Sequence, residues 1–428
     1  MDKRIEIIGP DNVVQIVADG EAANRAAGQI VMQMYSHITV SFCMAHCLNN
    51  LLKDIGNLEW IAPLIADASQ MVTFINNHNL LRSEFLKKSG GKVLLKYSDT
   101  RFAFNFLMLH RLSDCQSAVR QLFISDEFTS SSHATTASGI HCRERAESLI
   151  FWEDIKTLDA MVHPVVHLLR VVDGMQPCIG KVYEAMDRMI ESLEKLEPNP
   201  DRYDTIRRLC TKRWDSYASD LHGAAFVLDP EFQESGQEND TEVMSLFRRV
   251  LDRMVIDPLQ RRKVRDQLAA YRDLQGSYGL PDAQIDRFKI GSVLWWEDYG
   301  SDGPELQRLA ARILSQSVST SCLEQLWSTY SHIASKKRNR LGVQRASDLV
   351  YISANLRMLC KNATKKPDPF TQWEMEQEQV QKHGEGGVPS ALESELEEDI
   401  WEDLEDIEPS TMGSHDIEAT GSCAHSLE

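Results

Sequence analysis

The stretch from Trp295 to Leu359 reads WWEDYGSDGPELQRLAARILSQSVSTSCLEQLWSTYSHIASKKRNRLGVQRASDLVYISANLRML. After Pro304, which suits the first turn of a helix, apolar residues recur at helical spacing as far as Leu314. The serine-rich segment Ser315–Ser321 favours a new helix start, because its hydroxyls compete for backbone hydrogen bonds. We therefore predict one helix that ends before this segment and a second that begins near Cys322.

Apolar residues between Leu349 and Leu359 predict a third helix. Short amphipathic helices bury little apolar surface by themselves. The apolar faces of these three helices therefore need the rest of the fold, or a second subunit, to cover them.

The patterns WW..YG, P.L..LA.RILSQ and WSTYS.I.SKKRN.L resemble the C-terminal dimerisation region of hAT-family transposases, especially those of plants. The resemblance runs almost unbroken from Trp295 to Leu359. It implies that this segment completes a ribonuclease-H-like catalytic domain and forms the main subunit contact, in a homodimer or in a heterodimer with related hAT-like proteins. The residues that we assign to this contact are apolar or aromatic: Trp295, Trp296, Leu306, Leu309, Ile313, Leu323, Leu326, Trp327, Tyr330, Leu349 and Leu356.

The N-terminal part predicts alternating strands and helices. Residues 12–19 form a short β-branched run that ends in a carboxylate, as expected of a buried strand that brings Asp19 to a sheet edge. A helix over residues 22–34, a strand over 38–42 and a helix over 44–55 follow. The expected order is β-α-β-α.

This N-terminal part also resembles hAT proteins, through NVVQIV and through the signature CMAHCLNNLLKDI. Cys43 and His46 of that signature have the spacing of two zinc ligands, but two ligands do not complete a tetrahedral site. A packed cysteine beside a hydrogen-bonded histidine is the preferred interpretation, and no metal site is predicted.

The middle of the chain resembles the family more loosely. Arg101 and Phe102 stand where the family often has Arg beside Trp, so Phe102 is a candidate for stacking on an unpaired base, although core packing is the better interpretation. Residues 100–290 are expected to form a helical insertion. We expect residues 1–99 to form the first part of the ribonuclease-H-like domain and residues 291–362 to complete it.

The predicted fold class is therefore α/β and predominantly helical. It consists of an incomplete ribonuclease-H-like domain, interrupted by a large helical insertion and followed by an acidic, disordered tail over residues 363–428.

The family resemblance bears on catalysis through three acids, which hold Mg²⁺ or Mn²⁺ during strand transfer. It places the second acid at Asp19 and the third at Glu324, whereas the eighteen residues before Asp19 offer no strand for the first. The usual TDN around the second acid has become Ala18-Asp19-Gly20. We therefore expect relic catalytic positions, no cofactor and no enzyme activity. The alternative is an active DNA transposase represented by an N-terminally incomplete chain.

The net charge of −18 belongs almost wholly to the tail, because residues 371–428 carry seventeen acids and one Lys, leaving −2 for the remainder. The tail mixes acids with isolated Leu, Ile and Trp, and such a composition is typical of disorder. It is interpreted either as an activation or cofactor-contact segment or as a solubilising tail.

Charge and composition also bear on partners and location. The nearly neutral remainder does not support DNA binding, although DNA contact stays open. The basic run 336–340 is either a nuclear import signal or the basic end of a helix, so a nuclear location is expected. Nine scattered cysteines indicate reduced thiols and an intracellular protein. No apolar run approaches the length of about 20 residues that a membrane span needs.

Overall fold

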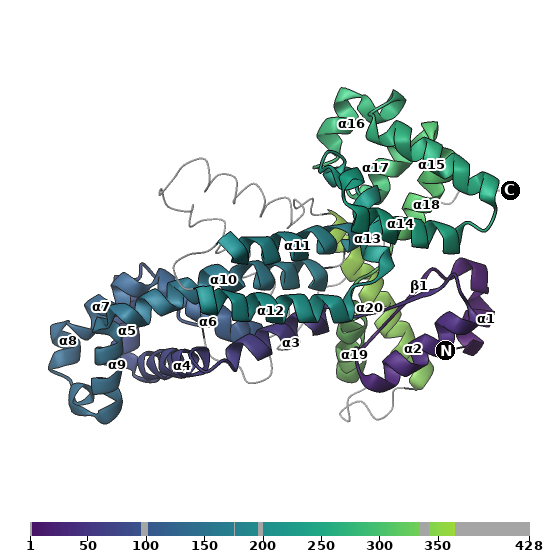
Figure 1. Cartoon of the computed structure of the whole chain (residues 1–428). Coiled ribbons are helices and arrows are strands. Elements are labelled where there is room, and N and C mark those ends of the chain that lie inside the picture. Colours follow the sequence, from purple (N-terminus) through teal and green to yellow (C-terminus); the bar gives the residue numbers. More distant parts are fainter. Residues whose placement is uncertain (1, 96–101, 175, 196–199, 334–341, 364–428) are drawn as a thin grey trace, which may run out of the picture. The chain divides into compact units, whose positions relative to one another are not determined.

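The computed structural model, drawn in Figure 1, describes residues 2–95, 102–174, 176–195, 200–333 and 342–363. The described residues are predominantly helical, apart from the short strands β1 (Gln15–Ala18) and β2 (Thr39–Phe42). The two strands pair in parallel, with Gln15 opposite Thr39 and Ala18 opposite Phe42. The predicted helix-rich α/β class is thus confirmed, whereas its ribonuclease-H-like identity stays a prediction.

The first elements follow the predicted β-α-β-α order. Helix α1 (Asp2–Ile8) and the short turn η1 (Pro10–Asn12) precede β1, and α2 (Ala22–Met34) leads to β2 and then to α3 (Met44–Gly56). A parallel pair requires such a crossover because both strands run in the same direction.

Strand β1 is half-buried along its length, so the prediction of a buried strand was wrong. The apolar cluster at this end of the chain contains Val40 of β2, Ile5 of α1, Val31 of α2 and Ile38. β2 therefore lies inside the cluster, whereas Ile16 of β1 packs on its outside and stays partly exposed.

A group of short helices follows α3. They are α4 (Ile61–Asn77), α5 (Asn79–Lys88), α6 (Phe102–Asp114), α7 (Gln116–Phe123), α8 (Asp126–Thr129), the turn η2 (Ser132–Thr135) and α9 (Ala137–Glu147). Helix α4 packs against α5, α6 and α9. Its buried residues recur at helical spacing and form one broad apolar side, against which the neighbouring helices pack.

Three longer helices form a bundle with α3, as Figure 1 shows: α10 (Leu149–Asp173), α11 (Ile179–Lys195) and α12 (Pro200–Tyr217). Both α10 and α12 pack against α3, and α11 packs against both α10 and α12. The guanidinium of Arg213 on α12 bonds the carboxylate of Asp54 on α3, with Nη2 and Oδ2 2.5 Å apart. Tyr217, the last residue of α12, contacts Phe42 of β2 with ring centres 6.3 Å apart, so the C-terminal end of α12 lies beside the strands.

The next helices surround an aromatic core. They are α13 (Asp220–Leu228), α14 (Thr241–Met254), α15 (Pro258–Arg272), α16 (Pro281–Asp286), α17 (Ser292–Tyr299) and α18 (Pro304–Leu314), with the turns η3 (Pro230–Phe232), η4 (Gln237–Asn239), η5 (Gly276–Gly279) and η6 (Gly300–Asp302). The side chains of Trp295, Trp296, Tyr271 and Tyr278 are almost completely buried there. Each indole N–H donates to a backbone carbonyl, so the buried N–H groups of both tryptophans are satisfied.

The last two helices, α19 (Ser321–Ile333) and α20 (Val343–Ala363), pack against each other. The predicted second helix begins at Ser321, next to Cys322. The predicted third helix begins at Val343, six residues before Leu349, where the apolar spacing starts. The prediction missed this start because the first turns of α20 are largely polar and carry no apolar stripe.

Three further predictions concern the helical insertion, the acidic tail and membrane spans. Helices α6 to α16 occupy the segment that was predicted to be a helical insertion, while its boundaries at residues 100 and 290 stay a prediction. The acidic tail lies outside the described residues. None of the described helices is both long and apolar enough to cross a membrane.

Candidate functional site

The carboxyl ends of β1 and β2 bring distant parts of the chain together. The backbone N–H of Cys43 donates to the carbonyl of Ala18 at 2.9 Å and so continues the parallel ladder beyond the strands. Asp19 and Cys43 therefore follow neighbouring strands at the same sheet edge. In parallel sheets this edge is where ligands and catalytic groups usually collect.

Asp19 is paired with a histidine at this edge. Nδ1 of His46, in the first turn of α3, lies 3.2 Å from Oδ1 of Asp19, and the two side chains are 45% and 44% exposed. The prediction of a histidine with a polar partner thus finds its partner in the strand-end acid. The sequence signal for this pair is that Asp19 follows the first strand and His46 lies just after the second, because the ends of parallel strands meet at one sheet edge.

Cys43 is completely buried and contacts the serine-rich segment. Its Sγ accepts the N–H of Thr320 at 3.3 Å, and the N–H of the following Met44 donates to the carbonyl of Val318 at 2.8 Å. The segment before α19 is therefore bonded to the start of α3. These contacts give Cys43 the packed role that its sequence position predicted.

The beginning of α19 also contacts α10. The hydroxyl of Ser321 donates to Oδ1 of Asp173, the last residue of α10, at 2.5 Å. Glu324 lies in the first turn of α19, so the two acids expected as relic positions belong to elements that meet at one sheet edge. The side chain of Glu324 lies outside the described atoms. Asp173 is a further acid here that was not proposed as a site residue.

Arg25 and Tyr217 close the edge from the side of α12. Nε of Arg25 donates to the carbonyl of Gly20 at 2.8 Å, and its guanidinium carbon lies 4.2 Å from the ring centre of Phe42 and 4.9 Å from that of Tyr217. A β-carbon on Gly20 would lie only 2.2 Å from the hydroxyl oxygen of Tyr217. Glycine after Asp19, a departure from the family pattern, therefore has a packing reason in this chain.

The chemistry available at the edge is limited by its ligands. A two-metal centre needs several carboxylates arranged around the ions. Among the described side chains, those at the strand ends do not form a group of three possible metal ligands. The described part of the edge thus offers two accessible carboxylates: Asp19, with an imidazole against it, and Asp173, which accepts the hydroxyl of Ser321.

The residues predicted to form the subunit contact fall into two groups. Trp295, Trp296, Leu306, Leu309 and Ile313 are buried in the chain's own core. The side chains of Leu323, Trp327, Leu349 and Leu356 are exposed on α19 and α20, and those of Leu326 and Tyr330 are half-buried. The first group therefore cannot touch a partner without opening this core, and the surface available for contact narrows to α19 and α20.

The exposed apolar surface of α19 and α20 contains more residues than we predicted for the subunit contact. Trp327 is 68% exposed, and Val343, Tyr351 and Ile352 of α20 are exposed as well. The ring centres of Trp327 and Tyr330 lie 6.3 Å apart at an angle of 75°, so they form an edge-to-face pair. A large exposed aromatic group among aliphatic neighbours is typical of an interaction surface.

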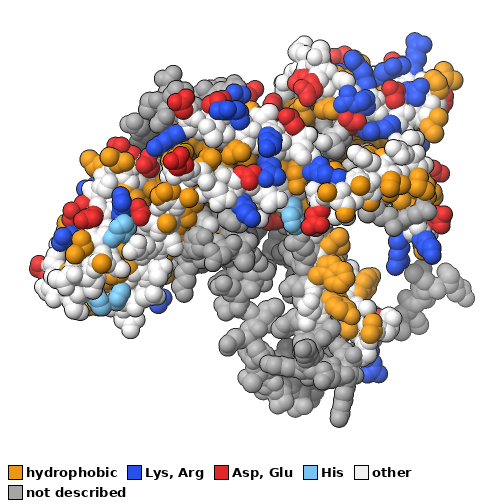
Figure 2. Space-filling view, turned by 60° about the horizontal axis from the view of Figure 1, so that its bottom comes forward, with side chains coloured by type: hydrophobic (Ala, Val, Ile, Leu, Met, Phe, Trp, Pro, Cys, Tyr) orange, Lys and Arg blue, Asp and Glu red, His pale blue; other side chains and the backbone are white. Residues whose placement is uncertain are grey.

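The nucleic-acid prediction is not tested by the described residues. Arg101 lies outside them, and Phe102 begins α6 without a described side chain. The basic run 336–340 also lies outside them. On the face drawn in Figure 2, acidic and basic side chains are interspersed, and hydrophobic side chains are exposed between them.

Six cysteines with described side chains are buried thiols: Cys43, Cys47, Cys115, Cys142, Cys178 and Cys210. Burial raises the pKa of Cys47 to about 12, although the nearby Arg213 acts in the opposite direction. A thiol with such a pKa is protonated at neutral pH and is therefore a poor nucleophile.

Comparisons with known families match the two ends of the described chain. A model described as the hAT family C-terminal dimerisation region matches residues 280–356. A model described as a domain of unknown function (DUF659) matches residues 1–71, the segment that contains Asp19, Cys43 and His46. No curated protein matches the chain.

Proposed function

The chain is an hAT-family transposase-like protein with the family's dimerisation region, and from this premise we propose that it acts through self-association without catalysing strand transfer. The contact surface in this proposal is the exposed apolar side of α19 and α20. The partner is a second copy of the chain or a related hAT-like chain.

The exposure of Trp327 carries the proposal. An aromatic side chain buried at a subunit contact contributes more binding free energy than most other residues, because its large ring removes much apolar area from water. Trp327 stands beside exposed Leu323 on the same helix, and α20 adds Leu349 and Leu356. By contrast, Trp295 and Trp296 are already buried and bonded within the chain.

The strand edge supports the non-catalytic part of the proposal. Asp19 contacts His46, and Tyr217 packs directly against Gly20 beside it. We also propose that the chain acts in the nucleus in a regulatory role, because residues 336–340 form a basic run.

Light scattering across a concentration series tests self-association. We expect a dimer whose dissociation constant rises by at least about 30-fold in Trp327→Glu, the equivalent of about 2 kcal/mol. Leu259→Glu is the matched control, because Leu259 is 72% exposed on α15 and has no place in the proposed contact. A monomer at all concentrations, or equal dissociation constants for both variants, contradicts the proposed surface.

The competing function is an active, metal-dependent transposase. The accessible position of Asp19 at the ends of parallel strands is the observation that favours it. DNA nicking that requires Mg²⁺ or Mn²⁺ and is lost in Asp19→Asn establishes this function and excludes the non-catalytic one. Nicking that persists in Asp19→Asn indicates a contaminating nuclease.

A further inference from the structure

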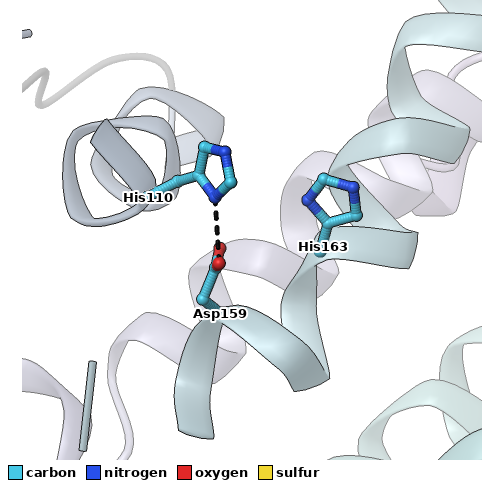
Figure 3. Close-up of side chains that lie close together, drawn as sticks. All are labelled: His110, Asp159 and His163. Carbon is cyan, nitrogen blue, oxygen red and sulfur yellow. Dashed lines mark hydrogen bonds and ion pairs between the residues drawn. The ribbon is translucent and has the colours of Figure 1, made fainter. Parts of the chain in front are cut away.

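Two histidines and an aspartate meet between α6 and α10, away from the strand edge. His110 lies on α6, and Asp159 and His163 are one turn apart on α10 (Figure 3). Nδ1 of His110 lies 2.9 Å from Oδ2 of Asp159, and the two imidazole centres are 5.6 Å apart. One ligand atom from each residue can be chosen so that all three lie within 4.8 Å of one another.

These distances are close to those around one metal ion. Ligands at about 2.0–2.2 Å from tetrahedral Zn²⁺ are roughly 3.4 Å apart. His110 and Asp159 are already this close. The ligand atom of His163 lies within 4.8 Å of the other two, so a shift of at most about 1.4 Å brings it to the same spacing.

A second histidine–aspartate pair in the chain shows what distinguishes the cluster. Nε2 of His141 lies 3.0 Å from Oδ1 of Asp67, much as in the first pair, but Nε of Arg145 lies 2.9 Å from the other oxygen of that carboxylate. The guanidinium of Arg145 neutralises Asp67 and cannot bind a metal. In the cluster, the third residue is His163, whose imidazole can bind a metal.

The protonation state of His163 suits a ligand. Burial lowers the pKa of His163, and the neighbouring His110 and Arg170 act in the same direction, whereas Asp159 opposes them. The imidazole of His163 is therefore neutral at pH 7, and a neutral ring nitrogen is the form that binds a metal.

The surroundings hold the three groups in place and leave access to solvent. Leu109, Leu158 and Val162, next to the cluster in sequence, are buried, so the helix segments that carry the ligands are fixed by packing. The side chains of His110 and Asp159 are 20% and 25% exposed. A water molecule can therefore reach a fourth coordination position.

From this geometry we propose that His110, Asp159 and His163 bind one divalent transition-metal ion. Two imidazole nitrogens and a carboxylate oxygen suit Zn²⁺, with water as the fourth ligand. The site is independent of the proposed self-association, because none of its residues lies on α19 or α20.

Cobalt titration of the purified full chain is the first test. Co²⁺ substitutes for Zn²⁺ and reports its ligands in the visible spectrum, while thiolate ligands add a strong near-ultraviolet band that identifies binding to cysteine. We expect one equivalent of Co²⁺ with nitrogen and oxygen ligands, displaced by Zn²⁺. No bound Co²⁺, or a spectrum of thiolate ligands alone, rejects the site.

Variants then assign the binding to these residues. Loss of a group that merely supports a ligand weakens metal affinity 10- to 100-fold, so His163→Ala and Asp159→Asn should each weaken Co²⁺ and Zn²⁺ binding by about 100-fold or more. His141→Ala, from the arginine-neutralised pair, is the matched control and should bind as the unaltered chain does. Equal affinity in all of these proteins overturns the proposal.

Thermal unfolding gives a readout that does not depend on spectra. A metal that binds the folded chain raises its melting temperature in proportion to the logarithm of metal concentration over the dissociation constant. Zn²⁺ should raise the melting temperature of the unaltered chain and of His141→Ala but not of Asp159→Asn. Asp159→Asn preserves side-chain shape and serves if His163→Ala does not fold. Equal shifts in the three proteins overturn the proposal.

Discussion

The backbone N–H of Thr320 donates a hydrogen bond to Sγ of Cys43 at 3.3 Å, across 277 residues of chain. The N–H of the same cysteine donates to Ala18 at the end of β1. A single buried residue thus joins the strand edge to the segment that begins α19. The N-terminal signature and the dimerisation region are thus connected through the side chain of Cys43.

Cys43→Ala is expected to lower the free energy of unfolding by about 1–3 kcal/mol, because it leaves a small cavity and removes the acceptor for Thr320. Urea denaturation measures this loss. Hydrogen exchange should also become faster at the amide of Thr320. Cys142→Ala removes another buried thiol and should leave that amide unchanged. Equal exchange in both variants contradicts the linking role.

Gly20→Ala should destabilise the fold by about 1–3 kcal/mol, because the added carbon would lie 2.2 Å from the hydroxyl of Tyr217. Gly291→Ala is the matched control, since nothing lies within 4 Å of a carbon added there, and its cost should stay below about 1 kcal/mol. Chemical denaturation of both variants decides the matter. Similar losses argue against the close contact at Gly20.

The two tryptophan positions should respond differently to truncation. Trp295→Ala should cost about 3–5 kcal/mol of folding stability, because the indole is fully buried and its N–H bonds the carbonyl of Ala283. Trp327→Ala should leave the stability of the monomer within about 0.5 kcal/mol. Denaturation at concentrations below the dimer dissociation constant separates folding from association. Equal losses would place Trp327 in the core.

Acid should destabilise the chain through His222. Burial lowers the pKa of His222 to about 4, whereas the unfolded chain has the ordinary value of about 6.5. Between these values the unfolded state binds more protons, so stability is complete above about pH 6.5 and falls as the pH drops toward 4. The loss amounts to roughly 3 kcal/mol.

His222→Gln tests this contribution. The variant loses the titrating ring, so its free energy of unfolding should change less than that of the unaltered chain between pH 6.5 and 4. Urea denaturation across this interval gives both curves. Parallel curves would mean that His222 does not couple folding to protons.

Local patterns predicted much of the N-terminal fold. The helix expected over residues 22–34 has those bounds, and the second strand and α3 begin within one residue of their expected starts. Periodicity succeeds there because each element carries its own apolar or β-branched pattern. It missed the start of α20, where polar residues hide the turn, and it overestimated the burial of β1.

Sequence alone determined the kinds of element, the family and the apolar character of the C-terminal helices, because these depend on residue type and spacing along the chain. Only the tertiary structure decided that Trp295 is covered while Trp327 is exposed, since both lie on apolar stripes and burial depends on what packs against each stripe. It likewise decided that His110 meets Asp159, 49 residues away. Packing of α6 on α10 creates that contact, and no local pattern in either helix contains it.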